Sequence, residues 1–395
     1  MSQMDRRQML KLLGSLGVAG AAAPVLSACG STGSSVEDLG PVKIGLMVPQ
    51  KGSYKSIGED MLNGFKLYLK LNEEKLGGRQ VKLVIQHEGE TPEEGKDAAQ
   101  KLVKDEKVLA VSGVANSLIM ENTYTTFEQQ QVPLVGSNAS PTTLQGVKYI
   151  WRTSFVNDEP GKALGKYVKQ QLGTNGSVYL LAPDYAGGQD EIKGFKLTYG
   201  EAGYAGEEKT LWPPPQHYDF SQSLAKIKAS KAEAVFCFYA GQPAVDFVQQ
   251  YASANVNKPL YAPGFLTEGA ALTAQGASAK NIFTSMNYSA DLDNPANRRF
   301  TVEYRNAFNT LPTTYAMASY DAAAVLDKAI GFSDEELTPV QLNQLIAKIG
   351  QVDSPRGVWR FNQNRTPQQA WYLRQVREDG PVLVNALMTE LLLLG

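Results

Sequence analysis

Two short loops rich in small polar residues could bind an anion. Each follows an apolar run that predicts a strand. The residues of interest in the two loops are Ala115, Asn116, Ser117, Asn138, Ala139 and Ser140. Each loop leads toward a predicted helix start, where free backbone N–H groups and positive potential favour negative charge. With the hydroxyls of Ser117 and Ser140, the loops form either a carboxylate cradle or two ordinary helix caps. The residues alone leave both interpretations open.

The sequence contains few of the patterns that support catalysis. It has only two histidines, His87 and His217, and they are far apart along the chain. The motifs of zinc sites, phosphate-binding loops and serine nucleophile elbows do not occur in it. Residues 291–294 resemble the start of a calcium loop but lack its central glycine. The sequence therefore favours a binding protein over an enzyme, and we expect no metal and no cofactor. A hydrolase would need a nucleophile–base pair, and neither histidine lies in a predicted cleft loop.

The N-terminus has the features of an export signal. Arg6 and Arg7 precede a charge-free apolar run over residues 12–26. This run is shorter than the roughly 20 residues that a membrane-spanning helix needs. The paired arginines resemble a twin-arginine (Tat) signal. We therefore predict a signal peptide over residues 1–28 that is absent from the mature protein.

A cysteine follows this segment directly. Residues 26–29 place small side chains before Cys29, which resembles a bacterial lipobox. We predict that Cys29 is lipidated and that the Ser- and Gly-rich residues 29–40 form a flexible tether. The protein would then be exported and held by its lipid at a membrane, on the extracytoplasmic side.

Composition limits the partners. The 38 basic and 40 acidic residues give a net charge of −2, so nucleic acid is not an expected partner. The only other cysteine, Cys237, lies in an apolar run and is expected to be a small buried hydrophobic residue. The length after processing suffices for two domains, and we expect a monomer.

Predicted strands and helices alternate from Val42 onward. Short apolar runs separated by amphipathic segments continue to about residue 154, and the pattern restarts near Gly161. Such alternation predicts parallel sheets with helices on both faces, and the restart predicts two α/β domains rather than one barrel. Residues 357–362 and 371–377 predict a closing antiparallel hairpin. In open sheets of this kind, ligands bind beyond the carboxyl ends of the strands.

Several short segments along the chain follow the pattern of one known family. They include Gly58-x-x-Met61-x-Asn63-Gly64, Gly77-Gly78-Arg79, Val111-Ser112-Gly113, Val132-Pro133-Leu134-Val135, Trp151-Arg152-Thr153, Asp184-Tyr185-Ala186-x-Gly188, Asp219-Phe220-Ser221 and Ala318-x-Tyr320-Asp321. Each segment is a weak match, but they run in order along nearly the whole mature chain. Through them the sequence resembles the type I periplasmic binding proteins of the branched-chain amino acid (leucine-binding) group.

The resemblance implies a two-lobed, venus-flytrap protein whose lobes are joined by three crossover strands. We expect the crossovers near residues 151–154, 282–287 and 333–336. The first lobe would comprise residues 41–153 and 284–333, and the second lobe residues 154–283 and 334–395. The lobes would rotate about the crossovers and close on a ligand that contacts both of them.

The resemblance also implies that the two serine loops hold a ligand carboxylate. Leucine-binding members place a glutamate after a strand end to face the ligand ammonium, but Gly264 stands at that position here. Glu268 is nearby, although its spacing is wrong. An unpaired ammonium in a dry cleft would cost several kcal/mol. Gly187 likewise occupies a place where the group often has a tyrosine.

Aromatic residues are plentiful around the expected cleft instead. They are Tyr54, Tyr185, Tyr239, Phe265, Tyr288 and Tyr315. Some are expected to pack in the core and others to touch the ligand, with Gly187 and Gly264 leaving space. A carboxylate cradle beside a roomy aromatic slot suits an aromatic or other bulky apolar carboxylic acid, with amino acids as the alternative.

The function predicted from these features is that of the capture component of an ABC importer. It would deliver a small carboxylate to a membrane permease and its ATPase. A ligand-sensing partner of a membrane receptor is the alternative of another class, because the same fold serves there.

Overall fold

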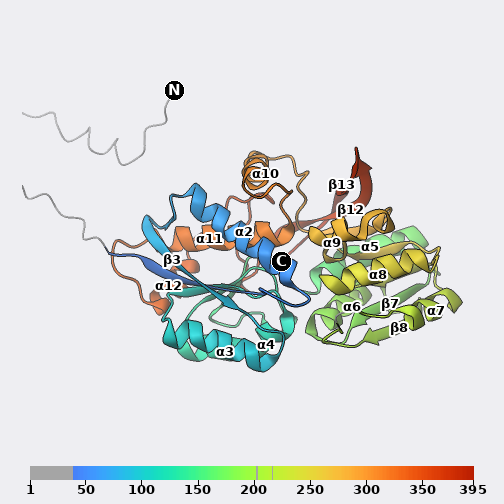
Figure 1. Ribbon diagram of the computed structural model, residues 1–395, viewed down its shortest axis with the longest axis horizontal. Helices are drawn as coiled ribbons and strands as arrows, with labels where there is room; N and C mark the ends of the chain where they lie inside the picture. The colour runs from blue at the N-terminus through green and yellow to red at the C-terminus, as the bar shows by residue number, and fades with distance from the viewer. Residues whose placement is uncertain (1–38, 202, 216) are drawn as a thin grey trace, which may run out of the picture. The chain divides into compact units, whose positions relative to one another are not determined.

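The computed structural model describes residues 39–201, 203–215 and 217–395. The predicted signal peptide over residues 1–28, the lipidation site Cys29 and most of the predicted tether lie outside the described residues. Two sheets of mostly parallel strands, each flanked by helices, form two lobes (Figure 1). This is the α/β architecture that the sequence predicts.

The first lobe is built on a six-stranded sheet with the order β2-β3-β1-β4-β5-β6. Its strands are β1 (Val42–Val48), β2 (Lys75–Leu76), β3 (Arg79–His87), β4 (Ala110–Gly113), β5 (Leu134–Gly136) and β6 (Ile150–Arg152). Neighbouring strands run parallel, except that β2 and β3 are antiparallel. The helices of this lobe are α2 (Lys55–Leu71), α3 (Pro92–Gln100), α4 (Ser117–Gln130), α10 (Pro295–Phe308), α11 (Thr314–Ile330) and α12 (Pro339–Ile346).

Both faces of the middle of this sheet are buried, which explains the continuous apolar runs of β1, β4 and β5. Leu46 of β1 packs in the core shared with α2 and α11, whereas the next residue, Met47, packs in the core shared with α3 and α4. Successive side chains of a strand point to opposite faces, so one strand contributes to two cores.

The second lobe is built on a seven-stranded sheet with the order β13-β12-β11-β10-β9-β7-β8. Its strands are β7 (Val178–Pro183), β8 (Tyr204–Thr210), β9 (Ala234–Cys237), β10 (Leu260–Pro263), β11 (Phe283–Met286), β12 (Gln369–Asp379) and β13 (Val382–Leu394). Its helices are α5 (Glu159–Leu172), α6 (Ala186–Tyr199), α7 (Ser221–Ala229), α8 (Gln242–Ser253) and α9 (Ala270–Gln275). Cys237 is fully buried between this sheet, α7 and α8, as the sequence predicts.

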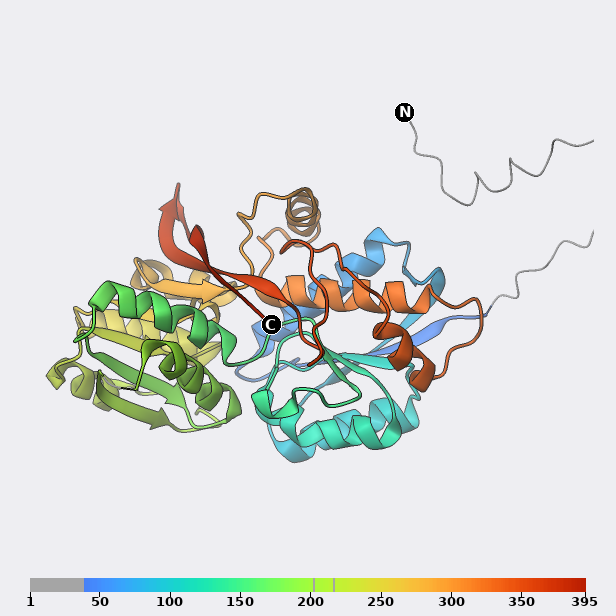
Figure 2. The same ribbon diagram turned by 180° about the vertical axis from the view of Figure 1, so that it is seen from behind.

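The first lobe is completed by a distant part of the chain. Helix α11 packs along α2 (Figures 1 and 2). The approach is so close that a Cβ added at Gly64 would lie 2.0 Å from the carbonyl oxygen of Ala316. The hydroxyl of Tyr68 also donates to Oδ2 of Asp327 over 2.8 Å, a contact between residues 259 positions apart. The first lobe is therefore discontinuous in sequence.

Three segments that connect the lobes meet at one hydrogen-bonded cluster. Nδ2 of Asn287 lies 2.8 Å from the carbonyl oxygen of Ser154 and 2.8 Å from Oε1 of Gln369. Nε2 of Gln369 donates to the same carbonyl of Ser154 over 2.8 Å. Ser154 follows β6, Asn287 follows β11 and Gln369 begins β12, so each connecting segment contributes one residue.

The expected third crossover at residues 333–336 is wrong. These residues link α11 to α12, which packs against α11 with Leu342 and Ile346 buried. Oδ1 of Asn343 on α12 also accepts a 2.7 Å hydrogen bond from Nε1 of Trp151 on β6. The chain crosses at Gln369 instead. Residues 334–368 were expected in the second lobe, but α12 belongs to the first lobe. Residues 284–286 were expected in the first lobe, but they are part of β11 and belong to the second.

The closing hairpin also differs from the expectation. It is formed by β12 and β13, which pair antiparallel from Gln369 to Leu394, whereas residues 357–362 make only isolated bridges. The leucines near the C-terminus lie in β13, the edge strand of the second sheet. Leu392 pairs there with Trp371, which is fully buried in the core.

Candidate ligand-binding site

A cavity lies at the carboxyl ends of the strands of both sheets. The cavity is small and nearly filled by its own side chains, and residues from both lobes line it. The lining residues are Tyr54, Ile57, Ala115, Ser117, Asn138, Ala139, Phe155, Asn157, Tyr185, Gly187, Glu191, Phe238, Ala240, Phe265 and Tyr315. Of the predicted site residues, eight are brought together here, and Ile57, Phe155, Asn157, Glu191, Phe238 and Ala240 were not predicted.

The first lobe contributes the start of α4. Asn116 is the N-cap of this helix, and its Oδ1 accepts a 2.9 Å hydrogen bond from the N–H of Leu118. The hydroxyl oxygen of Ser117 accepts a 2.9 Å hydrogen bond from Nδ2 of Asn157. The hydroxyl proton of Ser117 has no acceptor among the described residues, so it is free to donate into the cavity. A proton donor at a helix N-terminus is suited to a negative oxygen.

The second serine loop is arranged differently from the expectation. Ser140 does not cap an α-helix, because Pro141 has an extended conformation and only a short 3-10 turn, Thr142–Leu144, follows. The backbone N–H of Ser140 donates to Oδ1 of Asn157 over 3.0 Å, and its hydroxyl is buried outside the cavity without a hydrogen-bond partner among the described residues. Asn157 thus ties the two serine loops together, which sequence spacing alone could not show.

Two backbone amides of the predicted cradle are already in use. The N–H groups of Ala115 and Asn116 donate to the two carboxylate oxygens of Glu88, over 2.7 Å and 3.1 Å. Burial raises the pKa of Glu88 to about 8, although these two hydrogen bonds act to lower it. Asn116 borders an outer groove with Glu88 rather than the cavity. The sequence signal that could have predicted the contact between Glu88 and these amides is the position of this acid directly after β3.

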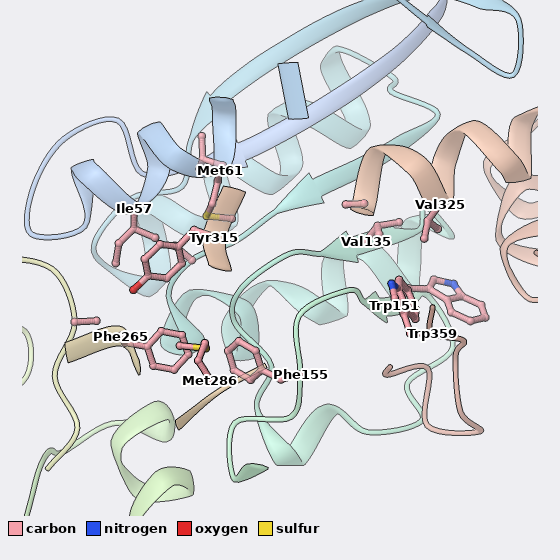
Figure 3. Close-up of a cluster of buried hydrophobic side chains, with 14 of the residues drawn as sticks. Ile57, Met61, Val135, Trp151, Phe155, Phe265, Met286, Tyr315, Val325 and Trp359 are labelled. Atoms are coloured by element: carbon pink, nitrogen blue, oxygen red, sulfur yellow. The ribbon is translucent and has the colours of Figure 1, made fainter. Parts of the chain in front are cut away.

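Aromatic rings form most of the remaining wall. The hydroxyls of Tyr54 in the first lobe and Tyr185 in the second lobe lie 3.1 Å apart and share a hydrogen bond. The ring of Phe265 lies 5.3 Å from that of Phe155 and 5.9 Å from that of Tyr315, centroid to centroid. Figure 3 shows the Phe265, Phe155 and Tyr315 rings grouped near Ile57 of α2. These rings give the cavity a mainly apolar surface with phenol hydroxyls.

Three more predicted site residues, besides Asn116 and Ser140, lie outside the cavity. Tyr239 points to the opposite side from its neighbour Phe238, because side chains alternate in extended chain, and its hydroxyl lies 3.1 Å from Oγ1 of Thr210. Tyr288 is fully buried, and its hydroxyl donates to Oδ1 of Asn297 over 2.9 Å. Gly264 faces the core, where an added Cβ would lie 2.3 Å from Nη2 of Arg374.

Gly187 and Glu268 also have structural explanations. An added Cβ at Gly187 would lie 2.8 Å from the hydroxyl oxygen of Tyr185, so the glycine makes room for that ring at the cavity wall. Glu268 forms a buried ion pair with Arg374, with 2.6 Å between oxygen and nitrogen. Its other oxygen accepts a 2.9 Å hydrogen bond from the N–H of Thr314, so Glu268 does not take the place of the missing acid.

Comparison with known proteins gives a family. The sequence matches the family described as periplasmic binding protein over residues 41–381. The chain belongs to this family. Members are extracytoplasmic proteins that bind small molecules for membrane transporters and are not enzymes. Among the described residues, we find no helix that is long and apolar enough to cross a membrane.

Individual relatives agree with this assignment. The chain is 28% identical to a Leu/Ile/Val-binding protein homolog of Brucella suis over 364 residues, covering 88% of this chain and 91% of that protein. It is similar to an ABC transporter solute-binding protein from R. palustris in complex with benzoate, with 28% identity, a TM-score of 0.81, and coverage of 89% and 98% of the two chains. A solute-binding protein from Rhodopseudomonas palustris BisB5 in complex with 3,4-dihydroxybenzoic acid has 25% identity, a TM-score of 0.81, and coverage of 89% and 97%.

Proposed function

We propose that this protein captures a small carboxylic acid with an aromatic or other bulky apolar body for an ABC importer. The observation that carries the proposal is the cavity, in which the Ser117 hydroxyl at the start of α4 faces a wall of aromatic rings. The solved relatives with benzoate and dihydroxybenzoic acid bind ligands of this kind. The exported and lipid-anchored form, with Cys29 acylated and the cargo passed to a permease and ATPase, belongs to the same proposal.

Lobe closure is the proposed capture step. Tyr54 and Tyr185 come from different lobes and already share a hydrogen bond across the cavity. A ligand that contacts both lobes binds the closed form better than the open form, and only such a difference can shift the equilibrium between them. Capture of an amino acid is the second candidate, because one carboxyl group, that of Glu191, lines the cavity.

A ligand screen with matched variants tests the carboxylate assignment. Purified protein is heated with benzoate, phenylacetate, leucine or isoleucine, and the best stabiliser is then titrated by calorimetry. A ligand at about 100 times its dissociation constant should stabilise the fold by about 2.7 kcal/mol. Ser117→Ala should weaken that ligand about tenfold or more, because a hydrogen bond to a charged group contributes about 1.5–3 kcal/mol.

Ser140→Ala is the control, because the Ser140 hydroxyl is buried outside the cavity. It should bind the ligand as the wild-type protein does. Equal affinities of the two variants would contradict the role of Ser117, and the lack of any stabilising carboxylate would contradict the proposed function.

A further inference from the structure

Glu191 is a buried acid of the cavity wall. It lies on α6, is 1% exposed, and lines the cavity opposite the first-lobe loops. Its Oε2 accepts a 2.9 Å hydrogen bond from the N–H of Gly161 at the start of α5. Its Oε1 has no hydrogen-bond partner among the described residues and is not among the fully enclosed atoms that lack one. The free side of this oxygen is therefore the cavity.

Two other buried glutamates, Glu88 and Glu268, differ in this respect. Both oxygens of Glu88 accept backbone N–H groups, and Glu268 is satisfied by Arg374 and the N–H of Thr314. An acid with one unused oxygen that faces a ligand cavity is a group that still lacks its partner, because buried carboxyl oxygens are normally hydrogen-bonded.

The charges around Glu191 favour a donor as that partner. None of the described residues that line the cavity is Lys, Arg or His. Burial holds the pKa of Glu191 well above its usual range, and the nearby acids Asp158, Asp190 and Glu159 raise it further. These acids favour a positive group at this end of the cavity, where a ligand ammonium would lower the pKa of Glu191 and bind its ionised form, while the protonated form can still accept a hydroxyl proton.

Ser117, Asn157 and Glu191 line the same small cavity. Nδ2 of Asn157 lies 2.9 Å from the hydroxyl oxygen of Ser117. A carboxylate held by Ser117 in so small a space would therefore have its neighbouring carbon atoms within reach of Glu191.

From this arrangement we propose that Glu191 is a specificity-determining residue that binds a hydrogen-bond donor, either a hydroxyl or an ammonium, close to the carboxylate of the ligand. The inference rests on the proposed function and narrows its substrate class to hydroxy acids and amino acids with a bulky apolar side chain. Glu191 on α6 would then take the role of the glutamate that leucine-binding members have at the position of Gly264.

Three ligands that differ in one group test this inference. They are 3-phenylpropionate, which has no donor beside its carboxylate, 3-phenyllactate, which has a hydroxyl, and phenylalanine, which has an ammonium. Calorimetry with the wild-type protein should show that phenyllactate or phenylalanine binds about tenfold or more tightly than phenylpropionate, the usual size of a hydrogen bond to a charged group. Which of the two binds more tightly identifies the donor.

Glu191→Gln keeps the size of the side chain and can still accept the N–H of Gly161, but it removes the acid. In this variant the affinity for the donor-bearing ligand should fall about tenfold, while the affinity for phenylpropionate should change little. Glu207→Gln is the control, because Glu207 pairs with Lys196 away from the cavity; it should bind all three ligands as the wild-type protein does.

Two results would overturn the inference and leave the proposed function intact. The first is equal affinity of the wild-type protein for the three ligands. The second is an unchanged preference in Glu191→Gln. Binding of benzoate or another acid of the first screen, without binding of any of these three ligands, would likewise overturn only the inference, whereas the lack of any binding carboxylate in both sets would overturn the proposed function as well.

Discussion

Replacing Asp321 by asparagine should strongly destabilise the protein. Asp321 is fully buried on α11, and its Oδ2 accepts hydrogen bonds from Nε and Nη2 of Arg356 at 3.2 and 2.7 Å, from Ser354 at 2.7 Å and from Nε1 of Trp359 at 2.9 Å. Arg356 in turn donates to the carbonyl oxygens of Thr153 and Ser154 and to Gln369. The ion pair therefore holds two of the three crossover segments.

The magnitude follows from the burial of both partners. The side chains of Arg356 and Asp321 are 1% and 0% exposed, so Asp321→Asn leaves a guanidinium in the interior without a counter-charge. Removing one partner of a buried pair costs about 3–5 kcal/mol, which is a large part of the 5–15 kcal/mol that separates typical folded and unfolded states. Asp321→Leu combined with Arg356→Met should recover part of this loss, because it removes both charges.

Urea unfolding followed by tryptophan fluorescence measures this effect, since Trp359 contacts Asp321 directly. Asp334→Asn is the control, because Asp334 is exposed in the link between α11 and α12, and it should stay within about 0.5 kcal/mol of the wild-type protein. A loss below about 1 kcal/mol for Asp321→Asn would refute the assignment of the pair to the stability of the crossovers.

Two further predictions concern lobe closure and pH. Tyr185→Phe removes the 3.1 Å hydrogen bond to Tyr54 between the lobes. This should shift the equilibrium from the closed form toward the open form by about 0.5–1.5 kcal/mol. Small-angle scattering without ligand should then show a larger radius of gyration, and an unchanged radius would contradict the role of this bond. Burial raises the pKa of Glu88 from 4.5 to about 8, of Glu159 from 4.5 to about 7 and of Asp60 from 3.8 to about 7. The folded state therefore binds more protons than the unfolded state, and the free energy of unfolding should fall as pH rises from about 5 to 8. Urea midpoints at pH 5, 6.5 and 8 measure this slope, Glu88→Gln should reduce it, and midpoints that rise with pH would be inconsistent with these shifts.

The local pattern of the sequence was sufficient for the architecture. Buried parallel strands are continuous apolar runs, so β1, β4, β7 and β9 could be recognised individually, and the restart near Gly161 separated the two sheets. The third crossover could not be recognised in this way. The connection at Gln369 is defined by hydrogen bonds to Ser154 and Asn287, which are distant in sequence and carry no local signal.

The lining of the cavity could be predicted where the strand ends determine it but not where side-chain direction does. Ala115, Ser117 and Asn138 follow strands and line the cavity, and their contact with a ligand stays a prediction. Tyr239 was preferred over Phe238, although only one of two adjacent residues can face the ligand, and the choice depends on the exact register of β9. Glu191 was not predicted because α6 presents it from a second turn, where an acid usually indicates an exposed helix face.

The pairing of α2 with α11 has a consequence for how the chain is made. The ribosome releases α2 and the first sheet long before α11, because the whole second lobe, except its closing hairpin, lies between them. Until α11 arrives, the surface of α2 around Gly64 has no covering partner, and the first lobe is an incomplete domain with an exposed apolar face. Such a face is prone to aggregation. A nascent chain stopped near residue 280 should therefore need a chaperone for its first lobe, while the full-length chain can bury the same surface within itself.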